Sequence, residues 1–123
     1  MAERLVGIRG ATTVEANRRE DILEATRELL EAMTRENALE PGSIVSALFT
    51  VTDDLNAEFP AAAARAIGWT EVALMCAREI PVPGSIGRCI RVLVHAYMAS
   101  DAGNVHHVYL REARSLRPDL GRG

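Results

Sequence analysis

The stretch CIRVLVHAYM, residues 89–98, decides the fold. Its even-numbered positions are all apolar, and its odd-numbered positions from 91 onward hold Arg91, Leu93, His95 and Tyr97. Because successive side chains of a strand point to opposite faces of a sheet, this pattern predicts a β-strand with one buried face. We therefore expect Arg91 in mid-strand, on the face that points away from the apolar residues.

Four further segments are predicted to be strands: residues 5–9, 44–51, 71–76 and 106–110. In the first of them Val6 and Ile8 share one face, so Arg9 is expected on the other. The second is nearly continuously apolar, which predicts burial on both faces. We expect the last two strands of the chain to form an antiparallel pair.

Two helices are predicted between the strands. In residues 18–36, apolar side chains recur at helical spacing and charged side chains fill most other positions. Asn17 and Glu20 have the spacing of a capping box, so we expect Asn17 to cap this helix. The second helix is alanine-rich. We expect it to start at Pro60 and to end at Gly68, because glycine readily adopts the left-handed conformation found after a helix C-terminus.

The order of these elements predicts a single α/β (α+β) domain over residues 1–123, with a mixed β-sheet, two main helices packed on one face and a flexible tail from about residue 117. A chain of 123 residues with 48% hydrophobic and 25% charged residues can bury a core without disulfides. No apolar run approaches the ~20 residues that span a bilayer, and the N-terminus lacks the features of a secretory signal. A cytoplasmic location away from membranes is therefore expected.

Composition also argues against several classes of function. All 14 basic residues are arginines, which excludes a lysine Schiff base. The net charge of −3 and the absence of a basic run argue against nucleic-acid binding. His106 and His107 are neighbours on a predicted strand and would point to opposite faces, and Cys76 and Cys89 do not form a CxxC pair. We expect no metal and no cofactor.

Four polar side chains occupy strand positions where solvation alone does not explain them: Arg9, Glu79, Arg91 and Tyr109. Guanidinium groups, a carboxylate and a phenol on one sheet face would suit a small anion that carries several carboxylates and a hydroxyl. The same residues would serve equally as ion pairs at a sheet edge or a subunit interface. Taken alone, the pattern leaves both interpretations open.

Six separated motifs carry a family resemblance. They are GIRGATTVE at 7–15, TDDLNAEFPA at 52–61, CAREIPVPGS at 76–85, CIRV at 89–92, HHVYLREA at 106–113 and LRPDL at 116–120. In this order, over about residues 5–121, they resemble the monofunctional chorismate mutases of the bacillus type. The resemblance implies an isomerase that rearranges chorismate to prephenate in phenylalanine and tyrosine biosynthesis, without metal or cofactor. It also implies a homotrimer whose sheets form a pseudo-barrel, with active sites at the subunit interfaces.

The resemblance implies site residues from two subunits. One subunit would supply five of them: the catalytic Arg91 and Glu79, and the substrate-binding Arg9, Tyr109 and Cys76. The adjacent subunit and the tail would supply further substrate-binding residues: Phe59, Ala61, Arg65, Leu116 and Arg117. The chain departs from the family at Ala62, where relatives commonly carry a lysine. A positive charge is thereby missing from the rim of the site, so substrate capture would depend more on Arg65.

The reaction so implied is a concerted Claisen rearrangement, in which one C–O bond breaks while a C–C bond forms. Arg91 would donate to the ether oxygen, Arg9 and Tyr109 would bind a carboxylate, and Glu79 and Cys76 would contact the ring hydroxyl. Two alternatives stay open: a non-catalytic trimer that binds a small carboxylate metabolite, and a related enzyme acting on an isomer of chorismate. The joint presence of Arg91 and Glu79 favours catalysis, because simple carboxylate capture requires no glutamate.

Overall fold

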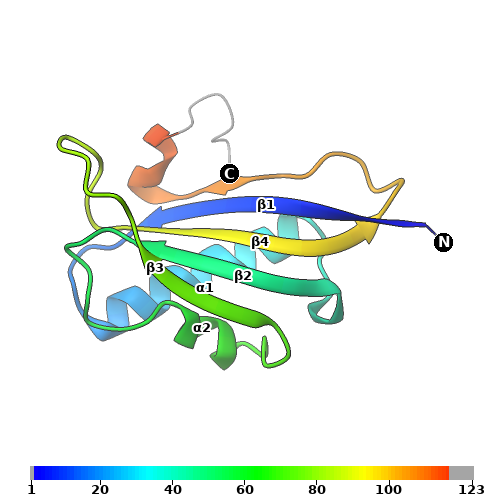
Figure 1. Cartoon of the computed structure of the whole chain (residues 1–123), viewed down its shortest axis with the longest axis horizontal. Coiled ribbons are helices and arrows are strands. Elements are labelled where there is room, and N and C mark those ends of the chain that lie inside the picture. The colour runs from blue at the N-terminus through cyan, green and yellow to red at the C-terminus, as the bar shows by residue number, and fades with distance from the viewer. Residues whose placement is uncertain (1, 117–123) are drawn as a thin grey trace.

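The computed structural model describes residues 2–116 of the chain. Its centre is a five-stranded mixed sheet with the order β3-β2-β4-β1-β5, and two α-helices lie behind it (Figure 1). The strands are β1 Glu3–Thr13, β2 Ile44–Val51, β3 Ala73–Arg78, β4 Cys89–Ala99 and β5 Val108–Tyr109. The helices are α1 Arg19–Glu36 and α2 Ala61–Ala66, with the short 3-10 helices η1 Pro41–Ser43 and η2 Arg111–Leu116. The predicted α/β (α+β) architecture, with two main helices on one face of a mixed sheet, is confirmed.

Strand β4 holds the sheet together. It pairs antiparallel with β1 along its whole length and antiparallel with β2 on its other side. Its even-numbered side chains are buried, as the alternating pattern predicted: Ile90, Val92, Val94, Ala96 and Met98. Arg91 is exposed on the opposite face, opposite Ala11 of β1 and Thr50 of β2. The prediction for β4 is confirmed, and it fixes which face of the sheet carries Arg91.

The prediction of a late antiparallel pair is wrong. Strand β5 does not pair with β4; it runs parallel to β1, with Gly10 opposite Val108 and Ala11 opposite Tyr109. The reason is that both edges of β4 are already occupied by β1 and β2, so a last strand is left only an outer edge. A chain that reverses after β4 then runs parallel to β1, because β1 and β4 are themselves antiparallel.

The main core lies between the sheet and α1. Ile8, Phe49 and Val94 from three strands are fully buried against Leu29 and Met33 of α1. Each such side chain contributes about 1.5–3 kcal/mol when it leaves water. The contact is close because β1 presents a glycine to the helix: a Cβ added at Gly10 would overlap the sulfur of Met33. None of the helices in residues 2–116 is long and apolar enough to cross a membrane.

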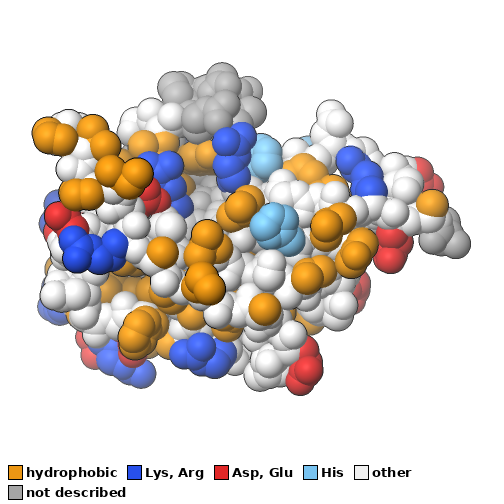
Figure 2. Space-filling view, in the orientation of Figure 1, with side chains coloured by type: hydrophobic (Ala, Val, Ile, Leu, Met, Phe, Trp, Pro, Cys, Tyr) orange, Lys and Arg blue, Asp and Glu red, His pale blue; other side chains and the backbone are white. Residues whose placement is uncertain are grey.

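The other face of the sheet is largely open in the single chain (Figure 2). Four large hydrophobic side chains lie exposed on the strands of this face: Leu5, Leu48, Met75 and Tyr97. The prediction that residues 44–51 are buried on both faces is therefore wrong for this chain. Helices cover only one face, so β2 alternates between buried Ala47 and Phe49 and partly exposed Leu48 and Thr50.

The ends of the two helices follow the predictions only in part. Helix α1 spans nearly the predicted residues, but Asn17 does not cap it; the N-cap is Arg18, without a side-chain hydrogen bond. The Asn17 carboxamide instead accepts hydrogen bonds from the backbone N–H groups of Asn56 and Ala57, each at 3.0 Å. The capping-box prediction failed because this tertiary contact takes up the side chain. Helix α2 is followed by Gly68 with a φ of +101°, as predicted.

Substitution of Gly10 by alanine tests the close packing of β1 against α1. We expect Gly10→Ala to lower the free energy of unfolding by about 1–3 kcal/mol, because the new methyl group must displace Met33 and lies 3.2 Å from Leu29 Cδ1. Gly7→Ala is the matched control on the open face, where the nearest atom, Leu93 Cδ1, would be at an ordinary 3.7 Å. Denaturant unfolding measures both variants, and equal stabilities would contradict this packing.

Candidate active site

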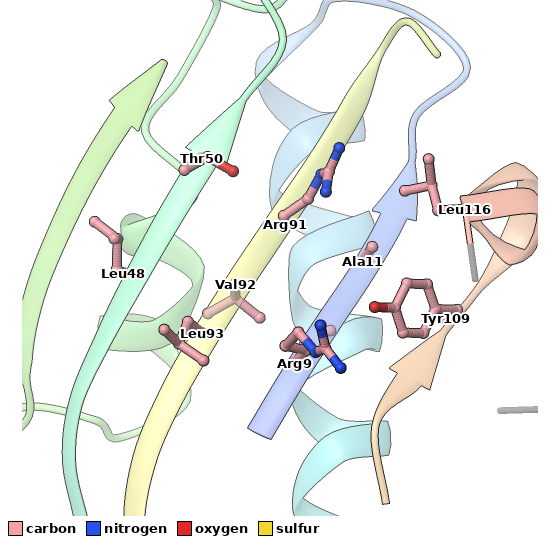
Figure 3. A pocket seen from close by; sticks show the side chains of 10 residues that line it. Arg9, Ala11, Leu48, Thr50, Arg91, Val92, Leu93, Tyr109 and Leu116 are labelled. Atoms are coloured by element: carbon pink, nitrogen blue, oxygen red, sulfur yellow. The ribbon is translucent and has the colours of Figure 1, made fainter. Parts of the chain in front are cut away.

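The open face of the sheet forms the floor of a cavity of about 410 Å³ (Figure 3). Arg9, Arg91 and the polar Thr50 rise from three adjacent strands, β1, β4 and β2. Apolar side chains of Leu48 and Leu93 lie further along the same floor. The cavity thus combines two guanidinium groups with an apolar base of about the size of a small metabolite.

Arg91 is held by an ion pair before any ligand arrives. Its Nε lies 3.3 Å from Oε2 of Glu79, and the Thr50 hydroxyl donates a hydrogen bond to the same oxygen. The Glu79 backbone N–H donates to the carbonyl of Val51 at 2.9 Å, which extends the β2–β3 pairing by one residue. Glu79, directly after β3, and Arg91 of β4 are thus brought together through Nε, and the guanidinium carries further N–H donors on its terminal nitrogens.

The charge on the cavity wall is positive. Among residues 2–116, Arg9 and Arg91 are the two charged residues that line it, whereas Glu79 approaches Arg91 from the side of a neighbouring cavity. The Arg91 side chain is 48% exposed and that of Glu79 24%. Both charges therefore remain partly solvated. A bound ligand that displaces this water would lower the local dielectric constant and so strengthen its own electrostatic interaction with the two side chains. The arrangement suits a small ligand with two carboxylates.

Tyr109 and Leu116 form the side wall of the cavity. They pack with Ala11 and Ala113 in a small apolar cluster, which folds η2 over one end of the open face. Tyr109 is buried, and its phenol oxygen points into the cavity toward β1 (Figure 3). The turn between the two wall residues lies at Arg111, whose Nε is 3.1 Å from Oε1 of Glu28 on α1. Arg111 Nη1 also donates to the carbonyl of Thr13 at 3.1 Å, so the chain directly after this two-residue strand is anchored to both α1 and β1.

The remaining expected site residues lie elsewhere in the chain. Phe59, 66% exposed, and Cys76 line a second cavity of about 380 Å³ at the start of α2. Cys76 is paired with Phe49, so it shares the helix-covered side of the sheet and not the open side of Arg91. The expectation that Cys76 shares a half-site with Arg91 is therefore not met within one chain. Ala61 is buried in the core and Arg65 is exposed on α2, and neither lines this cavity.

The sequence did not single out Thr50, although its hydroxyl contacts Glu79 and it lines the cavity. Finding it requires the register between β2 and β4, which places Thr50 directly beside Arg91. Leu48 and Leu93 are added to the site by the same register. Of the two expected tail residues, Leu116 lines the cavity, and Arg117 lies outside the described residues.

The described residues near this cavity include neither a reactive thiol nor a cluster of metal ligands. Cys89 begins β4 two residues before Arg91, and burial raises the pKa of its thiol to about 11. The thiol is therefore protonated at neutral pH and a poor nucleophile. Within residues 2–116 there is no group of three or more His, Cys, Asp or Glu side chains arranged to hold a metal ion. The chemistry of the cavity is that of fixed hydrogen-bond donors and charges.

Known proteins resemble this chain over nearly its whole length. Residues 5–120 match the family described as Chorismate mutase type I. Chorismate mutase AroH of Thermus thermophilus is 52% identical over 115 residues, covering 93% of this chain and 94% of that protein. Chorismate mutase AroH of Bacillus subtilis (strain 168) is 44% identical over 115 residues, covering 93% and 91%.

The solved structures give the same answer. The chorismate mutase from Clostridium thermocellum Cth-682 superposes with a TM-score of 0.86 at 50% sequence identity. The match covers 89% of this chain and 98% of that chain. Sequence and fold agree: the chain belongs to the chorismate mutase type I family.

Proposed function

We propose that this protein is a chorismate mutase, an isomerase that converts chorismate to prephenate. The observation that carries the proposal is the cavity in which Arg9 and Arg91 face a common space, with Arg91 pre-oriented by Glu79. Chorismate is a dianion with a ring hydroxyl, so it matches two cations and a carboxylate acceptor. The product serves the biosynthesis of phenylalanine and tyrosine, and we place the enzyme in the cytoplasm without metal or cofactor.

The mechanism needs no proton transfer and no covalent intermediate. In the Claisen rearrangement the ether C–O bond breaks as the new C–C bond forms, and negative charge grows on the ether oxygen. The enzyme has to hold the flexible substrate in its folded conformer and to stabilise that charge. Fixed guanidinium groups serve both tasks, because they need no reorganisation when the charge develops.

Each residue of the first cavity has a role in this scheme. Arg91 donates from its terminal nitrogens to the ether oxygen, while its Nε stays on Glu79. Glu79 accepts from the ring hydroxyl and offsets positive charge on the allyl fragment. Arg9 and Tyr109 bind a carboxylate of the enolpyruvyl side chain, and Leu116 closes the cavity at the wall. The apolar floor contacts the ring and excludes water.

We further propose that the protein is a homotrimer with its active sites at the subunit interfaces. Two observations support this assembly. The open sheet face exposes several large hydrophobic side chains, which a single chain leaves in water. The expected site residues also divide into two cavities, one with Arg91 and one with Phe59 and Cys76. A cyclic arrangement would bring the first cavity of one subunit to the second cavity of its neighbour.

In this arrangement the neighbouring subunit supplies Phe59 as an apolar wall, and Cys76 with it. Arg65 lies at the rim of the site. Because Ala62 occupies a position where relatives commonly carry a lysine, substrate capture depends more on Arg65. The methyl group of Ala61 is buried in its own core, so that residue shapes the site through the start of α2. Arg117, which lies outside the described residues, is proposed as a further substrate-binding residue.

The first test is the loss of chorismate absorbance on addition of purified protein in buffer with a chelator. Prephenate is confirmed by its conversion to phenylpyruvate in acid. We expect rapid turnover that the chelator does not affect. A folded protein that binds chorismate without converting it would instead be a carboxylate-binding trimer, and turnover of an isomer alone would identify a related pericyclic enzyme.

Substitution of Arg91 tests the assigned role directly. We expect Arg91→Ala to lower kcat by about 10²–10³ or more, because it removes a fixed donor at a developing oxyanion. Arg91→Lys should recover only part of this loss, since a point charge lacks the fork that reaches Glu79 and substrate together. Steady-state kinetics with chorismate measure both variants.

Arg27→Ala is the control, because it removes the same charge from the outer surface of α1, where Arg27 pairs with Glu31. It should keep the kinetic constants of the unmodified protein. Near-normal turnover in either Arg91 variant would contradict the role assigned to this residue.

A further inference from the structure

The loop between Glu79 and Arg91 cannot by itself set the geometry of that pair. Residues 80–88 project beyond the end of the sheet (Figure 1), and Ile80 is 79% exposed. The hydrogen bonds found inside the loop join only its first half, from Ile80 to Ser85. The pairing of β4 with β1 and β2 sets the register that places Arg91 beside Thr50, and contacts from outside the loop hold the point where the chain returns to the sheet.

The side chain of Asp54 stands where the loop re-enters the sheet. Its two carboxylate oxygens accept the backbone N–H of Arg88 at 2.9 and 3.1 Å. The Thr52 hydroxyl donates to the same carboxylate at 2.6 Å and accepts the backbone N–H of Cys89 at 3.0 Å. One carboxylate and one hydroxyl thus bind two successive N–H groups at the start of β4, directly from the end of β2.

Two further features show that this contact is closely fitted. A Cβ added at Gly87 would lie 2.9 Å from Asp54 Oδ2, so a larger residue there would require the carboxylate or the loop to shift. Arg88 has a φ of +47°, a conformation that residues other than glycine adopt at a cost. Such strain persists where surrounding contacts enforce it. Here the enforcing contacts include the carbonyl of Glu15, which accepts from Arg88 Nη1 at 2.8 Å.

The charge state of Asp54 fits this role. Burial acts to raise the pKa of its carboxyl, but the hydrogen bonds from Thr52 and from the Arg88 backbone outweigh burial and lower that pKa below its ordinary value. The group is therefore an ionised acceptor at neutral pH. Charge-assisted hydrogen bonds are about twice as strong as neutral ones, so the Arg88 N–H is held firmly. The Cys89 N–H donates to the Thr52 hydroxyl, which the same carboxylate orients.

We propose that Asp54 is a positioning residue for the reaction: with Thr52 it fixes the start of β4 on the end of β2, and thereby sets Arg91 against Glu79. The distances in sequence are short. Arg91 follows Arg88 by three residues, and Glu79 is itself attached to Val51 at the end of β2. Misplacement of a catalytic group by about 1 Å can cost 10²-fold in rate. The inference rests on the proposed mutase function.

The effect of Asp54 should appear in kcat more than in KM. The transition-state donor Arg91 and its partner Glu79 lie beside the contact, whereas Arg9 and Tyr109 bind the substrate carboxylate from β1 and β5. We therefore expect Asp54→Ala to lower kcat at least about tenfold while KM changes by less than about threefold. Asp54→Asn keeps one acceptor oxygen, so its kcat should lie between that of Asp54→Ala and that of the unmodified protein.

The experiment measures chorismate turnover at a temperature where thermal melts show every variant to be folded. Asp53→Asn is the matched control, because it removes the same charge from the neighbouring exposed residue and should leave kcat unchanged. Thr52→Val breaks the link between Asp54 and Cys89 and should resemble Asp54→Ala, whereas Thr52→Ser restores the hydroxyl and should restore kcat. The Thr52→Val and Asp54→Ala losses should not add in the double variant, since both break one network.

Three results would overturn the inference: kcat within twofold of the unmodified protein in folded Asp54→Ala, a rise in KM with unchanged kcat, or an equal loss in Asp53→Asn. If Asp54→Ala does not fold, the kcat and KM of Asp54→Asn and Thr52→Val test the inference by the same criteria. Failure of the proposed function itself would look different, because the unmodified protein would then not convert chorismate at all.

Discussion

The structure depends on the alternation of side chains along β4, a strand that pairs with β1 along its whole length and with β2 on its other side. Its even-numbered residues fill the core against α1, so its odd-numbered residues, Arg91 among them, have to point to the open face. A slip of one residue would bury a guanidinium and expose the core. The same constraint that stabilises the fold therefore places Arg91, the proposed catalytic cation, on a surface where a ligand can reach it.

Around this strand the site is assembled from hydrogen bonds at the sheet ends. The Thr50 hydroxyl and the Arg91 guanidinium both contact the Glu79 carboxylate, so the proposed catalytic pair is oriented without a bound substrate. Pre-orientation matters for a rearrangement without proton transfer, in which the enzyme contributes geometry and charge alone. The cavity that results is positive and open on one side, which fits a dianion and leaves room for a neighbouring subunit.

Much of this was predictable from the sequence, and the failures have definite physical causes. The alternation of β4, the extent of α1 and the exposed positions of Arg9 and Arg91 followed from periodicity, because burial on one face imposes it. Asn17 was misassigned because a tertiary contact competed for its carboxamide, and the partner of β5 because free strand edges are not visible in a sequence. Thr50 was missed because strand register, which decides the neighbours of each side chain, comes from the pairing of β2 with β4.

The central claim, that each active site joins the Arg91 cavity of one subunit to the Phe59 cavity of another, is tested by mixing two variants. Arg91→Ala inactivates the first cavity. Phe59→Asp inactivates the second, because it introduces a carboxylate that repels the substrate dianion. After joint unfolding and refolding at equal amounts, random cyclic trimers should contain about a quarter of sites with both halves intact. The account predicts about a quarter of the normal turnover, well above either variant alone; a mixture no more active than the mean of the two would contradict it.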